Sequence, residues 1–316
     1  MWRSLPTGRD LSLAFIGQLY VRSLSESDAR PLPGTEQPGN PIFSPDGQSI
    51  VFAQGGNARV LRRIAVAGGT PITICDLAIA PFGINWDGDW IVAGQGSNGI
   101  VRVAAGGGTP EQIVKVEPTQ IAHGPQILPG GRNILFTLAP STGPNPFDRA
   151  QIVVQSLSSG ERTVLVEGGS DARYLPAGHL VYAVQGTLLA VPFDVGRLQV
   201  TGAAVPVIEG VRRPVQAPGN SLAAQFSVAA NGTAVYVAGA ARAGFQDLAF
   251  SGRDGSREPL NLPPDTYRYP RLLPDGRQLV VGTDDMVSRC SWRAIRPCRM
   301  PMSGSCRSGN PKGRRC

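Results

Sequence analysis

Only two histidines occur in the chain, and one of them stands where it could take part in acid–base chemistry. His123 lies in the run Ala-His-Gly-Pro, at the entry to an expected strand, whereas His179 follows a glycine turn and begins another strand. A histidine near a carboxylate can act as a general acid or base close to neutral pH. We therefore treat His123 as a candidate ligand contact, with an ordinary loop residue as the alternative. For His179 we expect a surface or edge position.

One glycine motif, Gly94-x-Gly96-x-x-Gly99, has the spacing of a phosphate-binding loop. A kinase would need a strand lysine and the H-R-D and D-F-G runs, which the chain lacks; Lys115 is badly placed. A dinucleotide site would need a helix after Gly99, and none is expected. No G-x-S-x-G nucleophile motif occurs either. We predict a hairpin turn at this motif and no enzymatic activity.

The last thirty-one residues differ in composition from the rest. They hold eight of the basic residues, no acidic residue and four of the five cysteines, namely Cys290, Cys298, Cys306 and Cys316. No C-x2-C pair and no histidine accompanies these cysteines, so we expect neither a metal site nor a cofactor. We interpret residues 286–316 as a disordered or frameshifted tail, separate from a domain at 1–285. Cys75, the remaining cysteine, is expected to be a small buried side chain.

Charge and hydropathy limit the partners. The net charge is +7, and without the eight basic tail residues it becomes −1, so no nucleic-acid partner is expected for the folded body. No apolar run reaches the length of about 18 residues that a membrane span needs. Residues 11–21 are interrupted by Gln18 and do not predict a signal peptide. The compartment is left unassigned.

A turn ending in glycine recurs along the chain and is followed each time by a short apolar strand. The closing glycines are Gly8, Gly47, Gly88, Gly131, Gly178, Gly232 and Gly276, at spacings from 39 to 54 residues. Such a period is typical of a β-propeller, in which each repeat forms one four-stranded blade. In the turn Ser44–Gly47, proline presets φ, aspartate caps the backbone and glycine takes the left-handed position.

The repeats predict five full blades and two partial ones. The clearest full repeat spans residues 40–76, and the same order of strands returns at 81–116, 124–167, 172–209 and 223–262. The first segment supplies expected strands at 13–16, 19–24 and 29–32, and the last supplies strands at 269–273 and 278–282. These could close a sixth blade from both ends with one strand spare. The alternative is an incomplete ring of seven or eight blades.

The turns resemble those of TolB-type, WD-repeat-like β-propellers, in Ser44–Gly47, Pro274–Gly276 and the Ala-Gly-Gly-Thr-Pro run at 67–71. A closer likeness is to the propeller that follows the catalytic domain of bacterial serine/threonine protein kinases, carried by residues 19–24, 29–36, 188–194, 226–228 and 231–233. The resemblance covers residues 5–285. It implies a sensor or docking module and no shared catalytic set.

Loops that enter the inner strands converge at the ring mouth of a propeller, and loops on a rigid scaffold often carry function. From the register of the turns, the candidate ring-mouth residues are Asn40, His123, Asp171, Arg173, Gln225, Tyr269 and Arg271. Their mixed polarity suits a protein or peptide partner. We thus expect a non-catalytic interaction module that is a fragment of a kinase-linked protein. The alternatives are a hydrolase or lyase that uses ring-mouth carboxylates and His123, and a gene fragment without function.

Overall fold

The computed structural model describes residues 17–23, 29–55, 58–143, 146–212, 224–238, 248–251, 256–260, 266–274, 276 and 278–284. The chain divides into two units, residues 1–286 and 287–316, and all described residues belong to the first. The expected strand at 13–16 and the cysteine-rich tail therefore lie outside the described residues.

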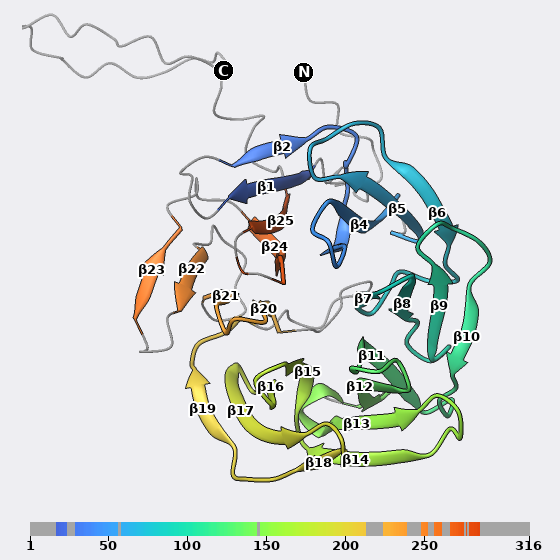
Figure 1. Ribbon diagram of the computed structural model, residues 1–316, viewed down its shortest axis with the longest axis vertical. Helices are drawn as coiled ribbons and strands as arrows, with labels where there is room; N and C mark the ends of the chain where they lie inside the picture. Colours follow the sequence, from blue (N-terminus) through green and yellow to red (C-terminus); the bar gives the residue numbers. More distant parts are fainter. Residues whose placement is uncertain are drawn as a thin grey trace, which may run out of the picture. The chain divides into compact units, whose positions relative to one another are not determined.

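The described residues form six antiparallel sheets, five with four strands and one with five, arranged around a centre (Figure 1). From the centre outward, the first three sheets contain β3 (Gly39–Phe43), β4 (Ser49–Gln54), β5 (Val60–Ala65) and β6 (Ile72–Asp76); β7 (Ile84–Asp87), β8 (Trp90–Gly94), β9 (Ile100–Ala104) and β10 (Glu111–Val114); and β11 (Gln120–Ile127), β12 (Asn133–Pro140), β13 (Gln151–Ser156) and β14 (Arg162–Glu167). The fold class predicted from the turns, an all-β propeller of four-stranded blades, is confirmed.

The next three sheets complete the ring. They contain β15 (Ser170–Leu175), β16 (His179–Val184), β17 (Thr187–Asp194), β18 (Gln199–Val200) and β19 (Val205–Ile208); β20 (Phe226–Val228), β21 (Ala234–Val237), β22 (Leu248–Ser251) and β23 (Arg257–Pro259); and β24 (Thr266–Leu272), β25 (Gln278–Asp284), β1 (Leu19–Ser23) and β2 (Arg30–Leu32). The fourth sheet has a fifth strand because the long β17 pairs with β18 near one end and with β19 near the other.

The sixth sheet is closed from both ends of the chain. β1 pairs antiparallel with β25, from Leu19 opposite Gly282 to Ser23 opposite Gln278. This pairing gives β25 a hydrogen-bonded neighbour on each side, so that it is not an open sheet edge. The sequence-based prediction of closure by the first and last segments is therefore confirmed for the described strands.

The core lies between the blades. Six clusters of buried apolar side chains each join two neighbouring sheets, so that every blade packs on the blade before and after it. The closing cluster, for example, brings Val280 of β25 against Ile50 of β4, both fully buried. A single blade cannot bury both faces by itself, and stacking around the ring supplies that burial.

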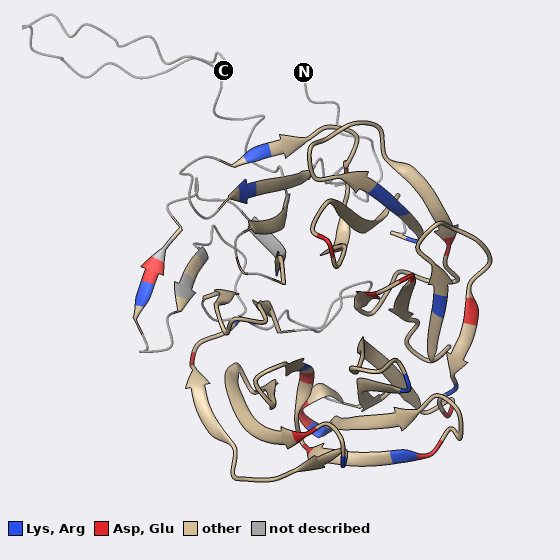
Figure 2. Ribbon diagram, in the orientation of Figure 1, with Lys and Arg blue, Asp and Glu red and all other residues tan. Residues whose placement is uncertain are grey.

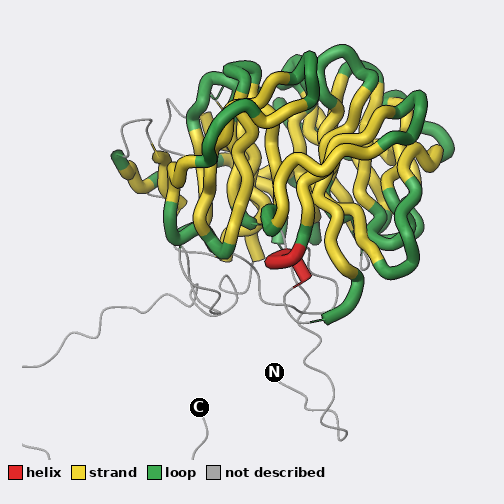
Figure 3. Tube along the Cα trace, turned by 90° about the horizontal axis from the view of Figure 1, so that it is seen from below, coloured by secondary structure: helices red, strands yellow, loops and turns green. Residues whose placement is uncertain are grey.

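The glycine motif and Cys75 both have the local structure that the sequence predicted. The glycine motif at 94–99 forms the predicted hairpin between β8 and β9, where the Gln95 N–H bonds to the Gly99 carbonyl at 2.7 Å. Cys75 is buried in β6 with 6% of its surface exposed, as expected for a small apolar side chain. One short 3-10 helix, η1 (Pro146–Arg149), joins β12 to β13 and lies at one face of the ring (Figure 3).

Candidate functional site

Irregular backbone interrupts the pairing of several inner strands with the next strand. The register shifts between Gly39 and Ile42 and between His123 and Gln126, and the same occurs at 170–173 and 268–271. Within these shifts Asn40 and Asp171 have left-handed backbones, with φ of 49° and 58°. Asn and Asp tolerate this conformation better than most residues. Each bulge turns a side chain out of the regular alternation, as bulges near functional sites do.

His123 and Asp171 meet across two neighbouring blades. Nδ1 of His123 lies 3.0 Å from Oδ1 of Asp171, and the two side chains are 1% and 3% exposed. The other carboxylate oxygen of Asp171 accepts hydrogen bonds from the Ala224 N–H at 2.9 Å and the Ser170 hydroxyl at 3.0 Å. The Asp171 N–H donates to the Thr137 hydroxyl at 2.8 Å. The pair is thus held by residues of β12 and β15 and by the segment that leads into β20.

The environment favours the charged form of Asp171. Burial alone raises the pKa of Asp171, but the charge and hydrogen bond of His123, the Ala224 N–H and the charge of Arg173 outweigh it. The net result is a pKa below the ordinary value for an aspartate. Asp171 is therefore a carboxylate at neutral pH, although it is buried.

Two aromatic rings enclose His123. Phe82 and Phe147 meet its ring edge-on, with centroid separations of 6.2 Å and 5.1 Å. Phe147 is carried by η1, so the connection between β12 and β13 covers the histidine at this face of the ring.

Arg173 links this buried pair to open space. Its Nη1 donates to the Gly124 carbonyl at 2.9 Å and to the Ala172 carbonyl at 2.8 Å. Burial lowers the pKa of Arg173, and the charge of Asp171 opposes that effect. A β-carbon at residue 124 would lie 3.4 Å from the same Nη1, so the glycine leaves room for the guanidinium.

A funnel of about 520 Å³ opens at the face where the inner hairpin turns lie, and every sheet contributes to its wall. Arg173 and Arg271 both line it. They hold the same position in the fourth and sixth sheets, and Nη1 of Arg271 donates to the Pro270 carbonyl at 2.9 Å, as Arg173 does to Ala172. Charged residues are otherwise spread along the strands and turns (Figure 2).

Side chains on the inner strands tie neighbouring blades together around the funnel. The Asn85 side-chain oxygen accepts from the Ile127 N–H at 3.1 Å, and that of Gln126 accepts from the Tyr174 N–H at 2.8 Å. The Ser227 hydroxyl accepts from Leu272 N–H at 3.0 Å. These bonds hold the wall in register, and such preorganisation is what a binding site needs.

The structure brings together three of the seven predicted ring-mouth residues, His123, Asp171 and Arg173, while Arg271 lines the funnel nearby. Asn40 is 7% exposed and donates to the Pro81 carbonyl at 2.8 Å, which links two blades. Gln225 is also buried, and the side chain of Tyr269 lies outside the described residues. Sequence reasoning missed Asn85, Gln126 and Tyr174, although Gln126 and Tyr174 each stand three residues after a predicted ring-mouth residue.

In the described part of the chain, no group of three or more His, Cys, Asp or Glu residues is placed to hold a metal ion. No helix in the same residues has the length and apolar character of a membrane span.

No family model and no curated protein sequence matches the chain. The resemblance to TolB-type and kinase-linked propellers therefore stays a prediction. Solved structures are similar in fold. A gluconolactonase from Xanthomonas campestris has a TM-score of 0.57 and 13% identity, over 78% of this chain and 85% of that one.

Two further structures have the same kind of fold. Regucalcin from Agrobacterium tumefaciens, a calcium-binding protein, has a TM-score of 0.55 and 12% identity, over 78% of this chain and 90% of that one. An oligogalacturonate lyase from Vibrio parahaemolyticus has a TM-score of 0.50 and 10% identity, over 84% and 97%. At such identities the likeness shows the fold alone.

These neighbours correct one inference from the sequence. We expected no enzymatic activity because the chain lacks kinase and hydrolase motifs. The gluconolactonase and the lyase have the same propeller fold and are named for enzymatic activities, which contradicts that inference. The missing motifs belong to other folds, so their absence does not separate a binding propeller from a catalytic one.

Proposed function

We propose that this chain is a propeller enzyme, a hydrolase or a lyase, that binds a small anionic or carbonyl-bearing substrate in the funnel. One observation carries the proposal. A buried carboxylate–histidine pair, Asp171 and His123, adjoins an arginine that lines an open pocket. Perturbed titratable groups beside a pocket are a mark of catalytic sites.

Arg173 and Arg271 are the groups that would meet the substrate. A guanidinium presents several N–H donors in a plane and matches a carboxylate or a developing oxyanion. Because the two arginines come from different blades, they could hold one substrate between them. Cations fixed where negative charge develops commonly supply a large part of an enzyme's rate enhancement.

His123 would take the proton, with Asp171 as its positioning residue. A carboxylate beside Nδ1 favours the tautomer with the proton on that nitrogen, in which Nε2 carries the lone pair that takes up a second proton. In a lyase the base removes a proton from the carbon beside a carboxylate, a double bond forms, and the C–O bond breaks as the leaving oxygen takes up a proton. In a hydrolase the base removes a proton from water, the water oxygen bonds to the carbonyl carbon, and the C–O bond to the leaving oxygen breaks as that oxygen takes up the proton. Because His123 is only 1% exposed and does not line the funnel, either route requires the wall between the funnel and His123 to move when substrate binds.

The test is turnover on a panel of aldonolactones, measured by acid release, and of oligouronates, measured by ultraviolet absorbance of the unsaturated product. We expect H123Q and R173Q to reduce kcat/KM by about 100-fold or more on the active class. R102Q is the matched control, because Arg102 pairs with Glu111 on an outer strand. No turnover of either class by the wild type, or equal turnover by all variants, would contradict the proposal.

A peptide or protein partner at the same funnel is the second candidate. The wall is drawn from all six sheets and combines arginines with Tyr174, Pro125 and Leu272, a mixture that suits a peptide. The resemblance to kinase-linked propellers supports this candidate. The test is a selection of binding peptides by display on the wild type. Loss of binding of the selected peptides in R173Q and R271Q, with binding kept in R102Q, would favour this candidate.

A further inference from the structure

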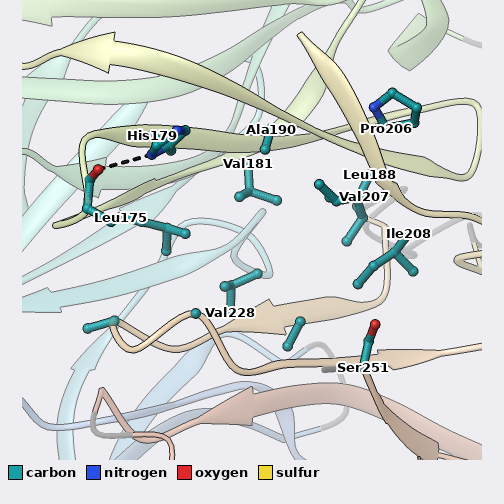
Figure 4. Close-up of a pocket in the computed structure, with 14 residues that line it drawn as sticks. Leu175, His179, Val181, Leu188, Ala190, Pro206, Val207, Ile208, Val228 and Ser251 are labelled. Carbon is teal, nitrogen blue, oxygen red and sulfur yellow. Dashed lines mark hydrogen bonds between the residues drawn. The ribbon is translucent and has the colours of Figure 1, made fainter. Parts of the chain in front are cut away.

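A second pocket, of about 630 Å³, lies between the fourth and fifth sheets (Figure 4). Its walls come from β15, β16, β17, β19, β20, β21 and β22 and are mainly aliphatic. It adjoins the funnel, with which it shares Leu175, Val228 and Ala230. None of the proposed catalytic residues lines it. The volume falls in the range of about 300–1,000 Å³ that is typical of small-molecule sites.

The sequence explains why space is left between these two blades. In each sheet, a residue near the end of the inner strand pairs with the first residue of the next strand that belongs to the cluster against the preceding blade. These pairs are Phe43–Ile50, Trp86–Ile91, Ile127–Ile134, Tyr174–Leu180, Val228–Ala234 and Leu272–Leu279. Five sheets place Ile or Leu at the second position, whereas the fifth sheet places Ala234.

In the pair of the fifth sheet, Val228 and Ala234 are each smaller than the residue at the same place in the other five pairs. Both line the pocket. Replacing a leucine by alanine in a packed core leaves a cavity unless the neighbours collapse. Here the neighbours have not collapsed, because Val181 and Leu188 of the fourth sheet still line open space. A ligand that filled this space would restore the packing that the other five interfaces obtain from Ile or Leu.

Two polar side chains stand at opposite ends of the pocket, with Val181, Val228 and Ile208 between them (Figure 4). At one end, Nδ1 of His179 lies 3.0 Å from the Ala177 carbonyl. A carbonyl oxygen only accepts, so Nδ1 carries the proton, and in the neutral ring Nε2 is left as an acceptor. At the other end stands the hydroxyl of Ser251, which is opposite Ala234 in the strand register.

We propose that this pocket binds a mainly apolar small molecule with a hydroxyl or carbonyl group at its ends. The apolar body occupies the space left by Ala234 and Val228. A ligand hydroxyl donates to Nε2 of His179, and the far polar group bonds to the Ser251 hydroxyl. The pattern of aliphatic walls with two placed polar groups is the usual one for such ligands. The site is independent of turnover in the funnel.

The probes are α,ω-alkanediols of six, eight and ten carbons, titrated while the melting temperature of the whole chain is followed. A ligand that binds only the folded state raises this temperature in a saturable manner. We expect at least one diol to do so. We expect A234L to bind that diol about tenfold more weakly or worse, while melting without ligand at or above the wild-type temperature. A203L, the same change at an exposed residue outside the pocket, should behave as the wild type.

V228L provides a second filling variant, so that poor folding of A234L leaves the proposal testable. S251A should weaken binding of the diol and should affect less the binding of the 1-alkanol of the same chain length, which carries a single hydroxyl. A saturable shift that both filling variants retain would overturn the proposal, as would the absence of any saturable shift in the wild type. Activity in the funnel does not enter this readout, so the two proposals can fail separately.

Discussion

Oδ1 of Asp171 lies 3.0 Å from Nδ1 of His123, across the boundary between the third and fourth blades, and both side chains are almost fully buried. The left-handed backbone of Asp171 sits in a bulge and aims its carboxylate at the histidine of the preceding blade. Fold and chemistry depend on each other at this point, since the same residue joins two blades and supplies the buried carboxylate of the site.

Replacing Asp171 with Asn should alter how stability depends on pH. Asparagine tolerates the φ of 58° and keeps the size of the side chain, so the change removes chiefly the charge. The folded-state pKa of Asp171 is lowered, so its contribution is present above the unfolded-state value of about 3.9 and is lost as pH falls through the folded-state pKa. We expect the free energy of unfolding of D171N to be about 3 kcal/mol lower than that of the wild type at pH 7. This gap between the two proteins should narrow below pH ~4.

Urea unfolding of both proteins at a series of pH values measures this gap. D89N, at an exposed carboxylate, serves as the control for a lost surface charge. A gap between D171N and the wild type that stays constant down to pH ~2 would show that the loss comes from packing and not from ionisation.

Two turn glycines separate backbone strain from steric conflict. Gly99 and Gly131 have φ of 78° and 69°, so alanine is strained at both. A β-carbon at Gly131 would meet no atom within 4 Å, whereas at Gly99 it would lie 1.9 Å from the Val114 carbonyl oxygen. We expect G131A to cost about 1 kcal/mol and G99A several times more, measured by chemical unfolding. Equal costs would mean that the hairpin relaxes freely around residue 99.

The periodic turns made the propeller predictable, because proline, aspartate and glycine each act on the backbone locally. The pairing of β1 with β25 followed from counting strands at the two ends of the chain. That His123 and Asp171 belong to inner strands could be predicted from the same register, although His123 lies inside β11 and not at its entry. Their direct contact could not, because it depends on bulges whose register shift leaves no periodic mark in the sequence.

The pocket between the fourth and fifth blades was missed for a different reason. Ala234 reads as an ordinary apolar strand residue, and its meaning emerges only when the six sheets are aligned by their cross-strand pairs. The enzymatic alternative was undervalued because motif searches test for other folds and say nothing about a site assembled from several blades.

Cys75 should resist alkylation in the folded protein. Burial, with a smaller effect of the Asp76 charge, raises the pKa of the Cys75 thiol to about 11, so little reactive thiolate exists at pH 8. We expect iodoacetamide to label Cys75 on the order of 100-fold more slowly in native protein than in urea, followed by mass spectrometry of its own peptide. Fast native labelling would place the thiol at an exposed site or show frequent opening of β6.

Ring closure should be needed for a soluble monomer. Without residues 1–33, β25 would lose the partner that spans Leu19 to Ser23, and the cluster around Val280 would lose Leu19, Val21 and Leu32. An open strand edge beside exposed apolar residues is a template for association. We expect the shortened chain to elute as dimers or larger species in size-exclusion chromatography with light scattering, and a peptide of residues 17–33 added in excess to return it toward monomer. An unchanged monomer with unchanged melting temperature would mean that the ring is held by its other blade interfaces alone.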